Sequence, residues 1–212
     1  AEVISMKVLL FGGFLGSGKT SLILDLAKFL VARANTDLTN SQSPSLVIIE
    51  NEVGERGIDD KILKANGLQV RELFSGCICC TLTTELTVTL NELKETFNPQ
   101  WVIVEATGMA YPHRIAETIH TYGKGIEELK ILIVADAERW EELTEIVPGL
   151  VEGQLTKADV VFINKIDCLE PETLEKVKIC IHNLNPTAQI FCVSGLQGLD
   201  PETWNKAVLG NE

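Results

Sequence analysis

The sequence lacks the features of several large classes of protein. No apolar run approaches the roughly 20 residues that a helix needs to span a bilayer, and the apolar stretch VLLFGGF near the start is broken by glycines and lacks the flanks of a secretory signal. Basic residues are in the minority, because 18 lysines and arginines face 30 acidic residues, which gives a formal net charge of −12. Such a charge repels phosphate backbones and anionic lipid surfaces. We therefore expect a cytoplasmic protein that binds neither nucleic acid nor membranes.

Histidine is also scarce, and the cysteines are not spaced as in a secreted disulfide framework. The three histidines are scattered, without a partner at the spacing of metal ligands. Three of the six cysteines, however, crowd into the segment ELFSGCICCTL as Cys77, Cys79 and Cys80. Such a local cluster favours metal or thiol chemistry in a reducing compartment. Three interpretations of the cluster remain open, namely a metal site, a redox switch and the packing of small apolar side chains.

Geometry and ligand chemistry favour the metal interpretation. Alternate residues of an extended segment point to the same side, so Cys77 and Cys79 would face one way, and Cys80 can turn inward at a bend. Thiolates are soft ligands suited to Zn²⁺, Cu⁺ or Co²⁺. A structural zinc site is closed by four protein ligands, and no C-x-x-C or H-x-x-H pair nearby in the sequence completes this one. Three thiolates with an open fourth position favour a labile or transfer site.

Short apolar runs rich in valine and isoleucine alternate with segments of helical length along the chain. This alternation is typical of buried parallel strands joined by crossover helices. The runs are residues 7–13, 45–51, 101–108, 129–137, 158–165 and 188–194. Between them, segments 19–34 and 82–97 place leucine and phenylalanine on one helical face. With 45% hydrophobic residues and no long linker, the sequence predicts a single α/β domain over residues 1–212, with a mostly parallel central sheet and helices on both faces.

The segment GFLGSGKT, residues 13–20, fits the P-loop pattern G-x-x-x-x-G-K-[ST]. It follows an apolar run and begins an amphipathic helix, so that glycines let backbone N–H groups close around phosphate oxygens and the helix start adds partial positive charge. Lys19 would reach the β and γ phosphates and stabilise the charge that develops on hydrolysis, and the Thr20 hydroxyl would bind Mg²⁺. The predicted phosphate-binding residues are Gly13, Gly16, Ser17, Gly18, Lys19, Thr20 and Ser21.

The run WVIVEATG ends with an acidic residue, Glu105, and a glycine, Gly108. P-loop hydrolases place such an acid near Mg²⁺ and such a glycine near the γ-phosphate. Glu105 is one methylene longer than the commoner aspartate, so it would approach Mg²⁺ through a water molecule. A carboxylate that merely caps a helix is the alternative role for this residue. The predicted catalytic residues are Lys19, Glu105 and Gly108.

The segment VVFINKID follows another predicted strand and supplies Asn164, Lys165 and Asp167. The Asp167 carboxylate could accept hydrogen bonds from N1–H and the exocyclic amine of guanine, whereas adenine would leave it poorly paired. Beyond the last strand, the segment VSGLQG places Ser194 and Gly195 where a backbone N–H could meet the guanine O6. An ordinary turn into the last helix is the alternative interpretation of that segment. Together these residues predict a pocket that selects GTP over ATP.

Taken in order, the motifs GGFLGSGKT, NEVGERGIDD, SGCICC, EATG, QLTKADVVFINKID and VSGLQG resemble those of the CobW-like GTPases. The resemblance implies a SIMIBI-type P-loop GTPase fold and a role as a metallochaperone or metallocofactor maturation factor, related to the nickel-insertion GTPases of hydrogenase and urease. It also implies that Cys77, Cys79 and Cys80 bind a transition metal next to the nucleotide. Glu52, in NEVGE, is a weaker candidate for a metal or water contact. CobW-like proteins commonly carry a C-terminal domain, so we expect a short form of the family.

We therefore expect slow hydrolysis of GTP to GDP and phosphate, with Mg²⁺, coupled to metal binding at the cysteine loop. Zn²⁺ and Co²⁺ are the first candidates for the metal, and Ni²⁺ is a third. The expected partners are a client metalloprotein or corrinoid enzyme, and a second copy of the chain in a nucleotide- or metal-dependent homodimer. The alternative function is a GTP-dependent chaperone that gates such an enzyme by protein contact and carries no metal itself.

Overall fold

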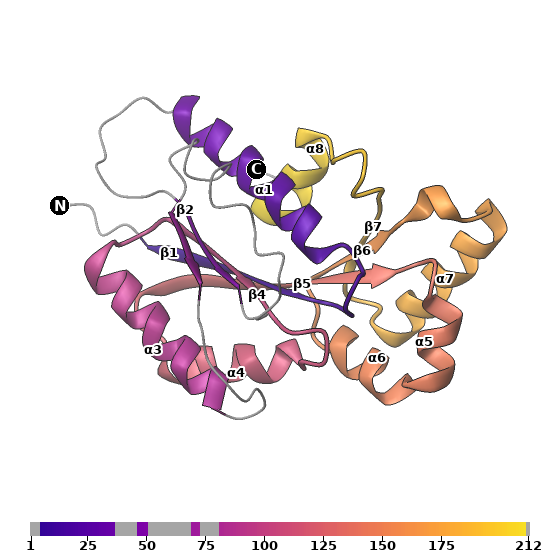
Figure 1. Ribbon diagram of the computed structural model, residues 1–212, viewed down its shortest axis with the longest axis horizontal. Helices are drawn as coiled ribbons and strands as arrows, with labels where there is room; N and C mark the ends of the chain where they lie inside the picture. The colour runs from indigo at the N-terminus through magenta and orange to yellow at the C-terminus, as the bar shows by residue number, and fades with distance from the viewer. Residues whose placement is uncertain (1–4, 37–45, 51–68, 73–80, 211–212) are drawn as a thin grey trace.

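A seven-stranded sheet forms the centre of the computed structural model, which describes residues 5–36, 46–50, 69–72 and 81–210 (Figure 1). The strand order is β3-β2-β4-β1-β5-β6-β7, and all adjacent strands pair in parallel. The strands are β1 (Met6–Gly12), β2 (Leu46–Glu50), β3 (Gln69–Glu72), β4 (Trp101–Glu105), β5 (Ile126–Asp136), β6 (Val160–Asn164) and β7 (Gln189–Cys192). The predicted α/β fold with a parallel sheet is confirmed.

Helices cover both faces of this sheet (Figure 1). One face carries α1 (Lys19–Thr36) and the C-terminal α8 (Pro201–Trp204) with the π-helix η2 (Asn205–Leu209). The opposite face carries α3 (Thr81–Thr96), α4 (Pro112–Tyr122), α5 (Trp140–Ile146), α6 (Pro148–Leu155) and α7 (Pro171–Leu184). The short 3-10 helix η1 (Ile166–Cys168) follows β6.

The strand β1 shows how the sequence builds two apolar cores. Val8 and Leu10 pack into the core under α3 and α4, whereas Leu9 and Phe11 pack into the core under α1. Successive side chains of a strand point to opposite faces, so an uninterrupted apolar run is buried on both sides. The leucines expected on the inner faces of the first two helices are buried as predicted, namely Leu22, Leu26, Leu30, Leu86, Leu90 and Leu93.

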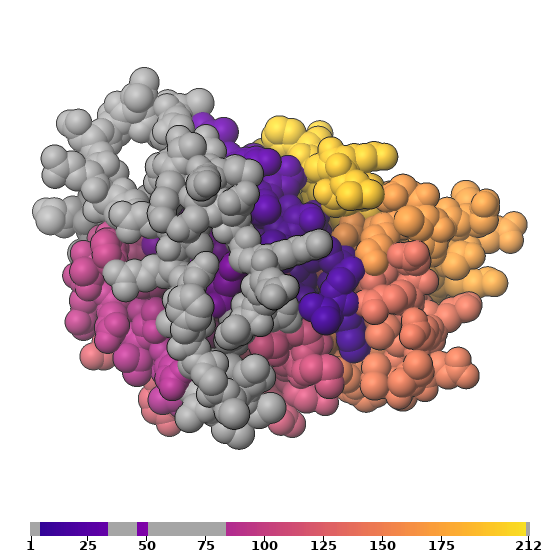
Figure 2. All heavy atoms as spheres, in the orientation of Figure 1, coloured from indigo at the N-terminus to yellow at the C-terminus, as the bar shows by residue number. Residues whose placement is uncertain are grey.

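The C-terminal segment is fastened to α1, which places one wall of the candidate site. Asp25 of α1 accepts hydrogen bonds from Leu199 N and from Trp204 Nε1, both at 2.9 Å. The buried Trp204 ring also packs edge-on against Phe162 of β6, with 5.3 Å between the ring centroids. Figure 2 shows the yellow C-terminal atoms lying against the indigo atoms of α1.

Two further features bear on the predictions. The cysteines Cys77, Cys79 and Cys80, and Glu52, lie outside the described residues. None of the helices in the described ranges is both long enough and apolar enough to cross a membrane.

Candidate nucleotide-binding site

The loop after β1 lies at the carboxyl edge of the sheet, between the ends of β4 and β5. Gly13 and Gly18 have φ angles of 133° and 97°, which residues with a Cβ rarely adopt. A Cβ on Gly13 would lie 2.3 Å from Val134 O, and one on Gly18 would lie 2.2 Å from Asn164 Nδ2. The backbone of the loop can therefore take this path, and approach β5 and β6 so closely, because glycine occupies these positions.

Two buried polar groups of this loop fit a phosphate ligand. Lys19 is 4% exposed, and its ammonium donates hydrogen bonds to Gly13 O at 2.9 Å and to Phe14 O at 3.1 Å. The Ser17 hydroxyl is buried and has no hydrogen-bond partner within the described part of the chain. A buried polar atom without a partner costs free energy, which a ligand oxygen or water would recover.

The first turn of α1 meets the end of β4 through Thr20 and Glu105. The Thr20 hydroxyl donates to the Glu105 carboxylate, with distances of 3.1 and 3.3 Å to its two oxygens. Phe11 pairs with Glu105 in the register of β1 and β4, so Glu105 lies directly beside the strand that leads into the loop. Hydroxyl and carboxylate oxygens are the hard ligands that Mg²⁺ prefers. The two residues predicted to bind Mg²⁺ are thus adjacent, and their chemistry fits the ion.

The segment after β4 packs directly against the P-loop. A Cβ on Gly108 would lie 2.7 Å from Leu15 N, so the two backbones are in close contact. Gln154 of α6 is buried, and its amide donates to Gly108 O at 2.9 Å and to Ala110 O at 3.4 Å. The structure thus places Gly108 against the P-loop and shows that α6, through Gln154, holds it there.

Asn164, at the end of β6, joins the two halves of the site. Its Nδ2 donates to Ser17 O at 2.8 Å, and its Oδ1 accepts from Gly195 N at 2.7 Å. The side chain is buried between these partners. Asn164 was predicted as a nucleotide contact, and in the structure its amide connects the P-loop to the segment that carries Ser194 and Gly195.

A pocket of about 450 Å³ opens between η1 and the segment after β7. Its lining includes Ile166, Asp167, Ser194, Gln197, Leu199 and Thr203. The buried Ser194 hydroxyl makes no well-aligned hydrogen bond with any of the described residues. It nevertheless faces the Asp167 carboxylate, and this interaction is the main reason that the pKa of Asp167 is lowered. An ionised, exposed carboxylate at the side of a pocket of this size fits a planar ligand that donates hydrogen bonds.

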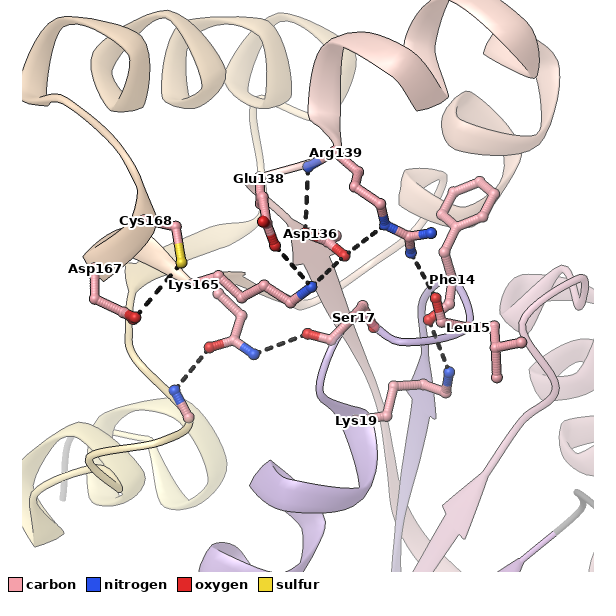
Figure 3. A network of polar contacts seen from close by, with 12 residues as sticks. Phe14, Leu15, Ser17, Lys19, Asp136, Glu138, Arg139, Lys165, Asp167 and Cys168 are labelled. Atoms are coloured by element: carbon pink, nitrogen blue, oxygen red, sulfur yellow. Dashed lines mark hydrogen bonds and ion pairs between the residues drawn. The ribbon is translucent and has the colours of Figure 1, made fainter. Parts of the chain in front are cut away.

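A charged network beside the P-loop contains residues that the sequence analysis did not single out (Figure 3). Asp136, the last residue of β5, has a fully buried side chain that accepts from Arg139 Nε at 3.0 Å and from Lys165 Nζ at 2.8 Å. Arg139 Nη2 in turn donates to Leu15 O at 2.5 Å, and Lys165 also contacts Glu138 at 3.3 Å. The sequence does hold a signal for this network, namely the acidic Asp136 near the end of the apolar run LKILIVADA. The carboxyl ends of parallel strands meet at one edge of a sheet, where ligands bind.

Lys165 is held by this network rather than free in the pocket. Its backbone is left-handed, with φ of 68°, and it lies between the strand β6 and the helix η1 that carries Asp167. Burial disfavours its charge, but hydrogen bonds and the charges of Asp136 and Glu138 outweigh that effect and raise the pKa of Lys165. The ammonium therefore stays charged and anchors this corner of the site.

The described ranges contain no cluster of three or more histidine, cysteine, aspartate or glutamate side chains that could hold a metal ion. The predicted metal ligands Cys77, Cys79 and Cys80 lie outside those ranges, as does Glu52.

The chain is similar to several known proteins in sequence and in fold. The chain is 31% identical to the zinc chaperone YeiR of Escherichia coli over 77% of its own length and 48% of that protein, and 25% identical to the zinc-regulated GTPase metalloprotein activator 1 of Dictyostelium discoideum over 88% and 45%. It spans about half the length of these curated relatives. The crystal structure of the hydrogenase maturation factor HypB from Archaeoglobus fulgidus superposes with a TM-score of 0.66 at 17% identity, over 97% of this chain and 89% of that one, which shows the fold. The family model described as CobW/HypB/UreG, nucleotide-binding domain, matches residues 7–192, and the chain belongs to this family.

Proposed function

We propose that this domain binds GTP with Mg²⁺, hydrolyses it slowly to GDP and phosphate, and couples the nucleotide state to transition-metal binding at the C-x-C-C loop. The observation that carries the proposal is the position of Asn164, whose amide connects the P-loop to the wall of the pocket beside Asp167. One nucleotide could therefore place its phosphates in the loop and its base in the pocket.

The chemistry of the pocket favours guanine. Asp167 is exposed at the pocket, and its lowered pKa keeps it an ionised acceptor. Guanine offers two adjacent donors, N1–H and the exocyclic amine, whereas adenine offers an acceptor at N1. The Gly195 N–H already donates to Asn164 Oδ1. The base contact proposed at Ser194 and Gly195 is therefore supported by the position of this segment and not by a free N–H of Gly195.

The residues of the loop support hydrolysis at the γ-phosphate. Lys19 is a buried cation that would exchange its two carbonyl partners for phosphate oxygens, and Thr20 and Glu105 would hold the ion. Bound Mg²⁺ would neutralise charge on the phosphates as water attacks. Gly108, packed on Leu15 and held by Gln154, would approach the γ-phosphate from the other side.

The metal part of the proposal rests on the cysteine motif and on what the relatives are called. YeiR is named a zinc chaperone and the Dictyostelium protein a zinc-regulated GTPase metalloprotein activator. We therefore put Zn²⁺ first, ahead of Co²⁺ and Ni²⁺, with Cys77, Cys79 and Cys80 as ligands. The partner would be a client metalloprotein, met by one copy of the chain or by a nucleotide-dependent homodimer in the cytoplasm.

A competitive titration tests the coupling. Zn²⁺ and Co²⁺ are titrated into the reduced protein without nucleotide, with GDP, and with a non-hydrolysable GTP analogue plus Mg²⁺. The same titrations use a variant in which Cys77, Cys79 and Cys80 are changed to serine. The matched control changes Cys180, an exposed cysteine of α7, to serine.

We expect binding that depends on the first set of thiols and is tightest with the GTP analogue. Coupling is reciprocal, so the metal should tighten the GTP analogue by the same factor. Equal metal affinity in all three nucleotide states would exclude the coupling. Retained GTP hydrolysis and client binding in the variant without Cys77, Cys79 and Cys80 would instead support the gating chaperone that carries no metal.

A further inference from the structure

The buried carboxylate of Asp136 lies between two cations that belong to different halves of the nucleotide site (Figure 3). Arg139 reaches from it to the P-loop, and Lys165 reaches from it to the corner that carries Asp167. A buried carboxylate is costly unless it is paired and hydrogen-bonded, and here both cations and the backbone N–H of Arg139 meet it. The three side chains therefore depend on one another.

Arg139 contacts the outer side of the P-loop. Its Nη2 donates to the carbonyl of Leu15, and a Cβ on Gly16 would lie only 3.8 Å from the same nitrogen. In a P-loop the N–H groups face the phosphates, so a guanidinium that binds a carbonyl of the loop supports the loop from behind. Arg139 is suited to this, because its planar fork donates to Asp136 through Nε while Nη2 reaches Leu15.

On the base side of the site, Lys165 joins Asp136 to the turn that leads to Asp167. Its left-handed backbone turns the chain from β6 into η1, and Asp167 lies two residues further on. With its ammonium held by Asp136 and Glu138, this turn has a fixed position relative to β5. A loss of the Asp136 charge would loosen the turn that presents Asp167.

We propose that Asp136 is a positioning residue for both the P-loop and the turn that presents Asp167, and that Arg139 is a positioning residue for the P-loop. The proposal rests on the guanine-nucleotide function proposed above. Arg139 acts on the phosphate side alone, whereas Asp136 acts on both sides, because among the described residues it is Asp136 that touches both cations.

Affinities for GDP and for IDP, each with Mg²⁺, separate these roles. Inosine lacks the exocyclic amine of guanine, so the ratio of the two affinities reports on the contact with Asp167. The variants are Arg139→Ala, Asp136→Asn and the double variant, each first checked for folding by thermal unfolding. The matched control is Arg33→Ala, because Arg33 also donates to a neutral oxygen, Asn205 Oδ1 at 3.0 Å, but lies at the far end of α1.

Arg139→Ala should weaken GDP binding about tenfold, within the usual range of coupling between sites, and leave the ratio of GDP to IDP affinity within about twofold. Asp136→Asn should weaken GDP binding at least as much and also lower that ratio. The double variant should bind GDP as Asp136→Asn does, because Asp136 acts on the P-loop through Arg139 and its loss already removes that support. Arg33→Ala should match the wild type.

A failure of the proposed function and a failure of the positioning role give different results. If the wild-type protein binds neither GDP nor a GTP analogue, the proposed function fails and this inference falls with it. If the wild type binds GDP and folded Arg139→Ala binds it equally well, the positioning role alone is overturned. Two results would overturn the role of Asp136 on both sides of the site. One is a double variant whose loss of GDP affinity is the sum of the two single losses, and the other is an unchanged ratio of GDP to IDP affinity in Asp136→Asn.

Discussion

At the scale of single residues, Asp167 offers the sharpest test of base selection. In Asp167→Asn the side chain presents one donor and one acceptor, which match the C2 carbonyl and N1–H of xanthine instead of the two donors of guanine. We expect GDP affinity to fall at least a hundredfold, because a charge-assisted pair of hydrogen bonds is lost, and XDP affinity to rise. Competition binding with the two diphosphates measures both changes.

The same variant carries its own control for folding. Asp167 is exposed and lies in the pocket, so its replacement should leave the unfolding temperature without nucleotide nearly unchanged. A variant that still prefers GDP over XDP would show that the base lies somewhere other than this pocket.

Cys168, beside Asp167, gives a prediction about reactivity. Its thiol is exposed and lies 3.6 Å from Asp167 Oδ2. Partial desolvation and the charge of Asp167 raise the pKa of Cys168, which lowers the fraction of reactive thiolate at neutral pH. Alkylation by iodoacetamide at pH 7 should therefore be slower than that of free cysteine and should still increase beyond pH 9. Mass spectrometry of Cys168 peptides over a pH series measures the rate.

Asp167→Asn serves as the comparison for this measurement, because it removes the negative charge while keeping the size of the side chain. Cys168 should then be alkylated faster at pH 7. An unchanged rate would mean that Asp167 does not control the thiol.

At the scale of elements, α6 supports the segment after β4 through one buried side chain. Gln154→Leu keeps the volume but leaves Gly108 O, packed on the P-loop, without its donor. We expect the free energy of unfolding to fall by about 1–3 kcal/mol, the cost of an unsatisfied buried group. Urea unfolding followed by circular dichroism measures the change.

Gln189→Leu is the matched control, because Gln189 is exposed at the start of β7. It should change the free energy of unfolding by less than about 0.5 kcal/mol, as surface substitutions usually do. Equal losses in the two variants would mean that the hydrogen bond of Gln154 contributes nothing specific.

The same scale shows what the sequence could and could not predict. Six strands were predicted as apolar runs, because a strand buried on both faces needs apolar residues at every position. The strand β3, with the sequence QVRE, carries no such run, since within the described residues it lies at the edge of the sheet, beside β2. Edge strands are commonly polar, so periodicity alone misses them.

For the site, the motifs predicted residues that the structure brings to one edge of the sheet, because nucleotide chemistry fixes residue type and spacing locally. The supporting contacts of Gln154 and Arg139 were missed. Gln154 lies 46 positions from Gly108, and Arg139 lies 124 positions from Leu15. Only the packing of α5 and α6 beside the P-loop brings these residues together, and no local pattern records it.

At the scale of the whole molecule, the site draws on nearly the full described chain. The P-loop follows β1, Glu105 ends β4, Asp136 ends β5, and the pocket proposed for the base joins residues after β6 and β7. A ligand that contacts segments so far apart in the sequence binds the folded state and not the unfolded chain. Nucleotide binding should therefore stabilise the domain as one unit.

The stabilisation has a definite size. GDP with Mg²⁺ at 100 times its Kd should raise the free energy of unfolding by about 2.7 kcal/mol. In Asp167→Asn, a Kd about a hundredfold higher reduces this gain to about 0.4 kcal/mol at the same GDP concentration, while the stability without GDP stays the same. Urea unfolding of both proteins with and without GDP measures the two gains. Equal gains in the two proteins would show that the stabilisation does not depend on the pocket proposed for guanine, and would leave the P-loop as its source.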